Sequence, residues 1–488
     1  MSSPHSERMS RVDTAWLRMD NDVNLMMIVG VWLLSPAITL VRLRKRISDK
    51  LLRYERFLQK VVPDAIGANW VGDDDFDIAK HVVPLGLQRR RRESERQALQ
   101  RLCGDLATTP LDHARPLWQF HLIEHYEGGS AIIVRIHHCI GDGVALTSVI
   151  LSITDGGADP PQRHHDAAAE DPHDVDSRVD ALIKAIDGYG HDVFRSLEAL
   201  THPREVILDS VDIAAGGLHV VSDLAALALM SDDSPTLLKG QPEGHKLVAW
   251  SEPIALDTVK AIGHALGCTV NDVLLACVAG AIGGSLRDRG DEPAGKEIRA
   301  MVPVNLRPLD QAWQLGNRFG LAPLVLPIGI ANPVARVYSI RQRMDQLKGS
   351  YQPVLAFALL ALSGLLLKPA QDVILGLFAK KTTAVMTNVP GPAQPLTICG
   401  STLRQAMFWV PTSGQIGIGV SILSYGGGVQ FGLITDRRLC PDPQAIIDRF
   451  EPEFDKLLML TMMLPWAVAS PPDEAPSVAR AKRASRAL

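Results

Sequence analysis

The stretch that decides the fold runs His137-His138-Cys139-Ile140-Gly141-Asp142-Gly143. It follows a β-prone run and precedes a helical pattern that begins at Gly143, so it predicts a loop between a strand and a helix. Adjacent histidines at a strand end, followed by an aspartate between glycines, rarely arise from packing alone. We therefore interpret the loop as a catalytic site that contains His138, His137 and Asp142.

The residues before the loop predict a β-hairpin, with strands at 118–125 and 131–136 around a Glu127-Gly128-Gly129-Ser130 turn. Side chains alternate along a strand, so one apolar set shares a face with His138 and the other face carries His137. The apolar set is Ile132, Val134 and Ile136. This face should line the core or a buried channel, with His138 pointing into it and His137 pointing to polar surroundings. A neutral imidazole there suits a general base, because its unperturbed pKa is about 6.5.

The rest of the loop has structural roles in this interpretation. Its glycines predict a tight turn, in which Asp142 accepts hydrogen bonds or an arginine and Gly143 supplies a φ or a close approach that a Cβ would block. Cys139 should point away from His138, and the sequence has no GxSxG elbow or phosphate-binding glycine loop. A lone histidine base predicts direct transfer, in which it activates a hydroxyl or amine of a substrate.

Composition excludes several classes of protein. The 488 residues suffice for two or three domains, and 50 Lys and Arg against 54 Asp and Glu argue against a nucleic-acid binder. The six cysteines lie far apart without a CxxC pair, which favours reduced thiols in a cytoplasm over disulfides or zinc. The first residues lack the pattern of a signal peptide. The mean hydropathy of +0.07 is high, yet the apolar runs at 25–41 and 351–367 are too short or interrupted to predict a membrane span.

Both halves mix helical and strand patterns, which predicts two α/β or α+β domains. We expect an N-terminal domain at 1–154, a linker with connecting helices at 155–244, a C-terminal domain at 245–465 and a flexible tail at 466–488. The linker contains a second pair, His164-His165, which a mobile segment would not hold in a catalytic geometry.

Further elements follow from periodicity. In the N-terminal half we expect a strand at 26–34 and a basic helix at 36–62, with Ser35 as N-cap and Pro36 at N1. In the C-terminal half we expect helices at 256–266, 271–289 and 334–349 and strands at 298–304, 383–387, 417–424 and 429–435. The basic face of the helix at 36–62 and the run Arg89–Arg92 have two interpretations. They are either solvated surfaces or surfaces that attract an anionic membrane or a ligand phosphate.

Several blocks occur in one order along the chain. They are Pro110-Leu111-Asp112 with Arg115-Pro116-Leu117-Trp118, Thr269-Val270-Asn271-Asp272, Met301-Val302-Pro303-Val304-Asn305-Leu306-Arg307 with Gly316-Asn317, Thr387-Asn388-Val389-Pro390-Gly391-Pro392, and Asp436 with Pro441-Asp442. With the HHxxxDG loop, this ordered set resembles the wax ester synthase/acyl-CoA:diacylglycerol acyltransferase family over nearly the whole chain. Thr387 stands where serine is more usual, and Gly141 stands where bulkier residues are common, which is expected to loosen the loop.

The resemblance implies two chloramphenicol-acetyltransferase-like domains, each a mixed sheet with flanking helices, and a tunnel between them with His138 at its middle. Acyl-CoA would enter from one side, and a fatty alcohol or diacylglycerol from the other. The implied products are wax esters and triacylglycerols, made without a covalent acyl-enzyme, a cofactor or a metal. The implied location is the cytoplasm, peripherally at the inner membrane or on lipid inclusions.

Some residues have two interpretations. Asn271 orients substrate or donates to the oxyanion, and is also a candidate N-cap; Asn388 shapes the tunnel or forms a plain turn. Trp118 contacts substrate or packs in the core. Arg307 is expected to pair with Asp142, as the superfamily implies.

The alternatives are another HHxxxDG acyltransferase, a condensation-type enzyme, or a low-activity protein that binds lipid droplets. The apolar runs at 351–367 and 373–379 are flanked by lysines. They either form a candidate docking surface for membranes or pack in the core.

Overall fold

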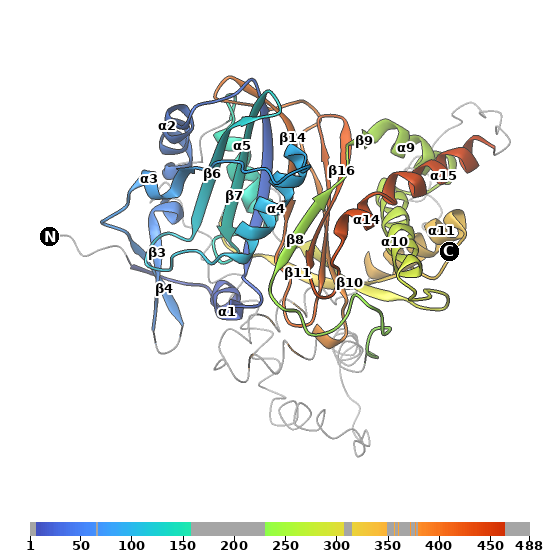
Figure 1. The fold of residues 1–488 in the computed structure, drawn as a ribbon. Helices are drawn as coiled ribbons and strands as arrows, with labels where there is room; N and C mark the ends of the chain where they lie inside the picture. The colour runs from blue at the N-terminus through green and yellow to red at the C-terminus, as the bar shows by residue number, and fades with distance from the viewer. Residues whose placement is uncertain are drawn as a thin grey trace, which may run out of the picture.

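The computed structural model describes residues 6–64, 67–157, 230–306, 315–348 and 379–463, with positions 356, 360, 371 and 376. Two halves, each built on a mixed sheet, lie side by side (Figure 1). Arg307, His164-His165, the helical patterns at 177–229 and most of the apolar runs at 351–379 lie outside the described residues.

The N-terminal sheet has six strands in the order β13-β14-β2-β7-β6-β5. Their bounds are β2 Met27–Ser35, β5 Val82–Pro84, β6 Trp118–Tyr126, β7 Gly129–His137, β13 Thr397–Ile398 and β14 Ser401–Trp409. The two central strands, β2 and β7, are apolar on both faces because both faces are covered. The predicted hairpin is confirmed as β6 and β7, which pair antiparallel.

The C-terminal sheet has the order β11-β10-β12-β15-β16-β8, with β9 paired to β16. Its strands are β8 Lys246–Trp250, β9 Ile254–Ala255, β10 Ile298–Asn305, β11 Phe319–Leu326, β12 Ala384–Pro390, β15 Ile418–Tyr425 and β16 Gly428–Asp436. A small third sheet contains β1 Ser6–Arg8, β4 Ala68–Gly72 and β3 Gln59–Pro63.

One pair of strands crosses between the halves. β13 and β14 come from the expected C-terminal domain, but β14 pairs antiparallel with β2 and so extends the N-terminal sheet. A division of the chain at residue 245 therefore does not separate the two sheets. The sequence pattern of a strand does not reveal which sheet it joins, because that is decided by long-range pairing.

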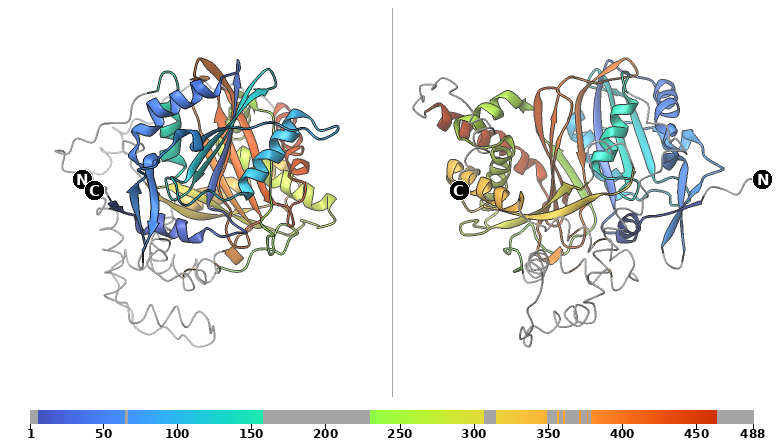
Figure 2. Two further views of the ribbon diagram at one scale, coloured as in Figure 1. Left: turned by 60° about the vertical axis from the view of Figure 1, so that its left-hand side comes forward. Right: turned by 180° about the vertical axis from the view of Figure 1, so that it is seen from behind.

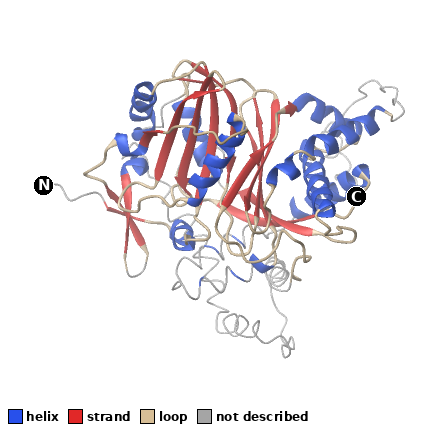
Figure 3. Ribbon diagram, viewed as in Figure 1, coloured by secondary structure: helices blue, strands red, loops and turns tan. Residues whose placement is uncertain are grey.

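The helices flank the two sheets. Their bounds are α1 Arg11–Met19, α2 Leu40–Lys50, α3 Ile78–His81, α4 Glu95–Thr108, α5 Gly143–Ile153, α9 Leu256–Ala265, α10 Val270–Asp288, α11 Pro333–Lys348, α14 Pro443–Ile447 and α15 Phe450–Met462, with 3-10 turns at Leu51–Arg53 and Glu55–Leu58. In the N-terminal half α4 and α5 lie on opposite faces of the sheet (Figure 2). In the C-terminal half the helices gather on the side of the sheet that faces away from the N-terminal half (Figure 3).

Helix α10 is the apolar centre of the C-terminal half. It contacts α9, α11, α14 and α15, and 14 of its 19 residues are buried. By length and composition it is the one helix among the described residues that would suffice to cross a membrane, but the core helix of a folded domain has the same composition.

The expected helix at 36–62 is wrong in its start and its length. Pro36 lies in the connection after β2, and α2 begins at Leu40 with Thr39 as its N-cap. The chain then forms 3-10 turns and strand β3, because Tyr54 and Phe57 turn inward to the core. Part of its basic face binds within the protein: Arg44 Nε donates to the carbonyl of Val82 at 3.0 Å.

The arginine run forms the exposed turn before α4. Arg90, Arg91 and Arg92 line an open groove whose other wall includes β8 and α14. Arg90 N donates to the Glu93 carboxylate at 2.7 Å, and Arg101 pairs with the same carboxylate at 2.9 Å. This groove is separate from the loop at 137–143.

Candidate active site

His138 lies where the two halves meet. Its imidazole stacks on the indole of Trp16 from α1, with ring centroids 4.1 Å apart and planes 11° apart. Phe319 from β11 of the C-terminal half lies 5.6 Å from the same imidazole. Burial lowers the pKa of His138 to about 4, so the imidazole is neutral near pH 7.

Asn317, from the C-terminal half, holds both the loop and helix α1 of the N-terminal half. Its Nδ2 donates to the backbone oxygen of His138 and to Oδ1 of Asp13 on α1, each at 2.7 Å. Both partners only accept hydrogen bonds, so the amide must present its nitrogen to them. Asp13 also accepts from Asn317 N at 3.1 Å, and burial raises the pKa of its carboxyl, an effect that these hydrogen bonds partly offset.

Asp142 holds the other end of the loop by accepting hydrogen bonds, as the sequence predicts. Its Oδ1 caps α5 by accepting from Val144 N at 3.1 Å and Ala145 N at 3.0 Å. Its Oδ2 accepts from Arg318 N at 2.9 Å. One carboxylate therefore joins the start of α5 to the strand that follows Asn317.

The glycines do not act as expected. Gly143 has no left-handed φ, and a Cβ there would meet no atom within 4 Å. The close approach occurs at Gly141, which bridges Gly316, and a Cβ at Gly141 would lie 3.3 Å from Leu315 Cδ2. The left-handed φ of 105° occurs at Gly316. Gly141 thus lets the loop pack against the C-terminal half.

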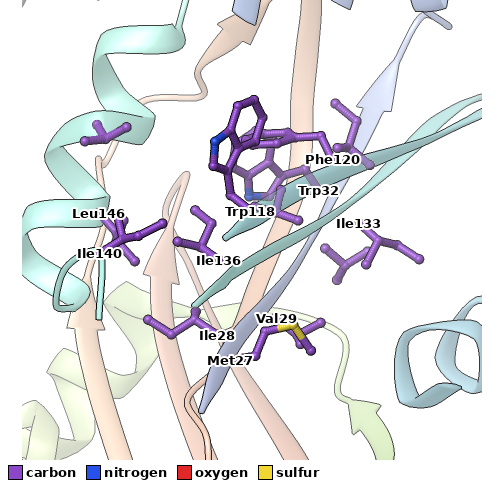
Figure 4. Close-up of a cluster of buried hydrophobic side chains, with 14 of the residues drawn as sticks. Met27, Ile28, Val29, Trp32, Trp118, Phe120, Ile133, Ile136, Ile140 and Leu146 are labelled. Atoms are coloured by element: carbon purple, nitrogen blue, oxygen red, sulfur yellow. The ribbon is translucent and has the colours of Figure 1, made fainter. Parts of the chain in front are cut away.

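An apolar cavity lies between the N-terminal sheet, α5 and the C-terminal half. About 880 Å³ of space lies between its lining atoms, and part of this space is open to solvent. Alternate residues of the central strands line it, namely Ile28, Gly30, Trp32, Val134 and Ile136. Figure 4 shows Ile28, Ile136 and Leu146 converging from β2, β7 and α5. The predicted apolar face of β7 therefore lines a cavity through Val134 and Ile136. His138, which was expected to point into it, is not among the lining residues; the cavity reaches Ile136 before the loop and Gly143 at its end.

His137 has polar surroundings, as alternation predicts. Its Nδ1 accepts from Cys139 N at 3.2 Å, so in the neutral ring Nε2 carries the proton. That Nε2 lies 3.8 Å from Asp20 Oδ1, while His113 Nε2 lies 3.6 Å from Asp20 Oδ2. Burial raises the pKa of Asp20, but the two histidines more than offset this, so the pKa lies below its usual range.

The cysteines supply no nucleophile here. All six are unpaired, and Cys139 is buried. Burial raises the pKa of Cys139 well above its ordinary value, so the thiol stays protonated near neutral pH. Among the residues described, no group of three or more His, Cys, Asp or Glu side chains is placed to hold a metal ion.

The structure brings Asn271 and Asn388 together, away from the loop. Asn388 Nδ2 donates to Asn271 Oδ1 at 2.7 Å, and the neighbours Val389 and Gly391 line the cavity. Asn271 is not the N-cap of α10. Thr269 is, in a capping box with Asp272.

Trp118 belongs to the core and does not line the cavity, which supports core packing over substrate contact as its role. Its indole is fully buried, donates to the carbonyl of Phe57 at 2.9 Å and stacks on His81. Figure 4 shows it beside Phe120 and Trp32.

Sequence reasoning missed Asp13, Trp16 and Asp20 around the two histidines, and Gln371, which contacts the helix that carries Asp13 and Trp16. Gln371 is buried and donates to the carbonyl of Ala15 at 3.1 Å. No local signal marks these side chains, because α1 reaches the loop only through tertiary packing. The block Gly316-Asn317 was a sequence signal for the hydrogen bonds by which Asn317 holds the loop.

Comparisons with known proteins agree with this architecture. Residues 9–274 match the wax ester synthase/diacylglycerol acyltransferase catalytic domain, and residues 315–458 match the C-terminal domain of the same family. A probable diacylglycerol O-acyltransferase of Mycobacterium tuberculosis, tgs1, is 27% identical over 423 residues, which are 85% of this chain and 87% of the relative. Wax ester synthase/diacylglycerol acyltransferase 5 of Arabidopsis thaliana is 24% identical over 445 residues, covering 83% of this chain and 84% of the relative.

Solved structures confirm the predicted two-domain fold. The wax ester synthase/diacylglycerol acyltransferase of Marinobacter aquaeolei superposes with a TM-score of 0.64 at 20% identity, covering 94% of this chain and all of that one. The first condensation domain of the calcium-dependent antibiotic synthetase has a TM-score of 0.56 at 15% identity, covering 94% and 96%. Condensation domains thus share the fold, while the family matches are specific. The chain belongs to the wax ester synthase/diacylglycerol acyltransferase family of acyltransferases.

Proposed function

We propose that this enzyme moves a long-chain acyl group from acyl-CoA to the hydroxyl of a fatty alcohol or a diacylglycerol, with His138 as the general base. The observation that carries the proposal is the buried, neutral imidazole of His138 at the junction of the halves, beside an apolar cavity. The family match supports the reaction class, and the relatives' names supply the two acceptors.

The chemistry follows from a lone base. The neutral imidazole takes the hydroxyl proton as the alcohol oxygen attacks the thioester carbon. The carbonyl electron pair moves to oxygen and forms a tetrahedral oxyanion. Collapse restores the carbonyl, breaks the carbon–sulfur bond and expels the CoA thiolate, which recovers the proton from the imidazolium. No protein nucleophile is required, which fits the protonated Cys139.

The fold must supply more than the base. General-base catalysis contributes about 10²–10⁴-fold, so holding two substrates in line must contribute much of the remainder. Asn317 and Asp142 hold the loop from both sides, and His137 supports it through Asp20. Asn271 and Asn388 are proposed to line the substrate path in the C-terminal half.

The test is a product profile. The purified full chain is given palmitoyl-CoA with hexadecanol, dioleoylglycerol or hexadecylamine, and CoA release and lipid products are measured. We expect ester formation with one or both alcohols that is lost in His138→Ala. His121→Ala is the matched control, because His121 is also buried with a pKa lowered to about 4 but lies on β6, outside the loop.

Each outcome decides between functions. Full activity of His138→Ala would contradict the mechanism. Amide formation with hexadecylamine and no ester would favour a condensation-type enzyme, whose fold the chain shares. Lipid binding without CoA release would favour a droplet-binding protein.

We also propose that the enzyme works in the cytoplasm, attached peripherally to the inner membrane or to lipid inclusions, since its substrates are lipids. The end of α15 supports a lipid contact, because Met459, Met462 and Met463 are 64%, 71% and 79% exposed. Replacing Met459 and Met462 by lysine should reduce flotation with phosphatidylcholine vesicles. Glu451→Lys, at the other end of the same helix, is the control. Equal flotation of both variants would contradict the proposal.

A further inference from the structure

The neighbourhood of His138 holds an unusual concentration of buried polar atoms without hydrogen-bond partners. Among the described residues, five of the eleven such side-chain atoms belong to this neighbourhood. They are Trp16 Nε1, His137 Nε2, His138 Nδ1, Asn317 Oδ1 and Gln371 Oε1. Buried polar groups are normally satisfied, and exceptions call for an explanation such as a catalytic role. The cluster therefore has the character of a site whose missing partners are substrate atoms.

Only one of these atoms is a hydrogen-bond donor without another role. The oxygens of Asn317 and Gln371 accept only, and His138 is the proposed base. His137 Nε2 faces the Asp20 carboxylate at 3.8 Å. The indole N–H of Trp16 remains, and an indole nitrogen donates but does not accept.

The position of Trp16 fits a donor to the reacting group. Its ring stacks on the imidazole of His138 with 4.1 Å between centroids, so the indole N–H and the base lie on adjacent, nearly parallel rings. Trp16 is buried, so bulk solvent does not reach its N–H.

The indole is also fixed relative to the base. Asp13 and Trp16 are three residues apart on α1 and so share one face of the helix. Asp13 accepts from Asn317, which in turn donates to the backbone of His138. Gln371 holds the same helix turn through the carbonyl of Ala15. A donor fixed in this way needs no reorganisation when charge develops in the transition state.

We propose that the Nε1–H of Trp16 donates the hydrogen bond that stabilises the oxyanion of the tetrahedral intermediate. The proposal rests on the acyl transfer proposed above and names a residue for a step that His138 alone leaves open. The N–H keeps its proton throughout. The hydrogen bond strengthens as the carbonyl electron pair moves to oxygen, and weakens when that pair returns and the thiolate leaves.

The first variant removes the N–H and keeps an aromatic ring. In Trp16→Phe, kcat for CoA release should fall about 10²–10³-fold, as for the loss of one oxyanion donor. Affinity for S-hexadecyl-CoA, a thioether without the carbonyl oxygen, should stay within about threefold of wild type, since an oxyanion donor acts only in the transition state. Trp409→Phe is the matched control, because Trp409 Nε1 is also buried without a partner but lies in the core on β14.

A second variant guards against misfolding. Benzothienylalanine at position 16, introduced by amber suppression, keeps the shape of the indole and replaces N–H by sulfur, and it should show the same loss of kcat. Retained kcat in either variant, or a parallel loss of thioether affinity, would overturn the role of Trp16. Wild-type protein that releases no CoA with any acceptor would instead overturn the proposed function, so the two failures are distinguishable.

Discussion

His137 and His138 are neighbours in the chain but lie in opposite chemical surroundings. His138 lies between Trp16 and Phe319, with its pKa lowered to about 4 by burial. His137 faces the Asp20 carboxylate, and its Nδ1 accepts from the backbone within the loop. The end of β7 and the turn that follows thus place one histidine where it can act as a base toward substrate and the other where it supports the loop. The predictions below test this separation.

The largest effect on kcat is expected when each histidine is replaced by glutamine in turn. His138→Gln should lower kcat about 10²–10⁴-fold with little change in melting temperature, because it removes the base. His137→Gln should lower kcat less but reduce the free energy of unfolding by about 1–3 kcal/mol, because it disturbs a buried hydrogen-bond network. Steady-state kinetics and urea denaturation of both variants measure the two effects. Equal losses of kcat would contradict the separation.

The next effect concerns Asn317, which hydrogen-bonds the backbone oxygen of His138 and the Asp13 carboxylate. Asn317→Ala leaves Asp13 and the His138 carbonyl without their amide donor, so the free energy of unfolding should fall by about 3 kcal/mol. The loss should grow between pH 5 and pH 8, because without Asn317 the pKa of buried Asp13 rises further and ionisation at higher pH opposes folding. Urea denaturation at both pH values checks this. A loss that does not depend on pH would mean that Asp13 is not the group affected.

A smaller effect is expected from Asp20→Asn, which removes the charge opposite His137. The free energy of unfolding should fall by about 1 kcal/mol, since His113 is half exposed and screened by water. Asp20 raises the pKa of His113, so the stabilisation is complete below the unfolded pKa and is lost as pH rises through the folded pKa. The loss should therefore be greater at pH 6 than at pH 8. Thermal denaturation at both pH values, with His113→Gln as control, tests the sign.

The smallest effect is expected from pH on the intact enzyme. A base with a pKa of about 4 in the free protein stays neutral at pH 5, so kcat/KM should fall less than about twofold between pH 8 and pH 5. Stability should decline over the same range, because the unfolded chain protonates this histidine near pH 6.5 while the folded chain does not. Half-maximal kcat/KM at pH 6.5 would contradict the buried environment.

The sequence predicted what depends on local pattern. The hairpin, the loop and helix α5 follow from alternation, glycines and periodicity, and the structure places them within one or two residues. The same reasoning predicted different surroundings for His137 and His138, although β7 ends at His137 and His138 lies in the turn that follows. The HHxxxDG loop and Asn317 were visible as motifs.

The rest depends on contacts between distant segments. Trp16 and Asp13 lie on a short helix whose sequence gives no hint of His138, more than 100 residues later. Gly143 was assigned a role from its place in the motif that its surroundings do not support, and for Trp118 only the surroundings decide between the core and the substrate path. Asn271 was a plausible N-cap until Thr269 was seen to make those hydrogen bonds.

The strand that crosses between the halves has a consequence for how the protein is made. Because β14 pairs with β2, a ribosome has exposed the open edge of β2 for some 370 residues of synthesis before its partner appears. Open apolar edges recruit other chains, and pairings so distant in sequence form late. An N-terminal fragment that ends before β13 should therefore aggregate on expression, and supplying residues 379–463 as a separate chain should return it to the soluble fraction. The unit of folding, like the unit of catalysis, spans both halves of the gene product.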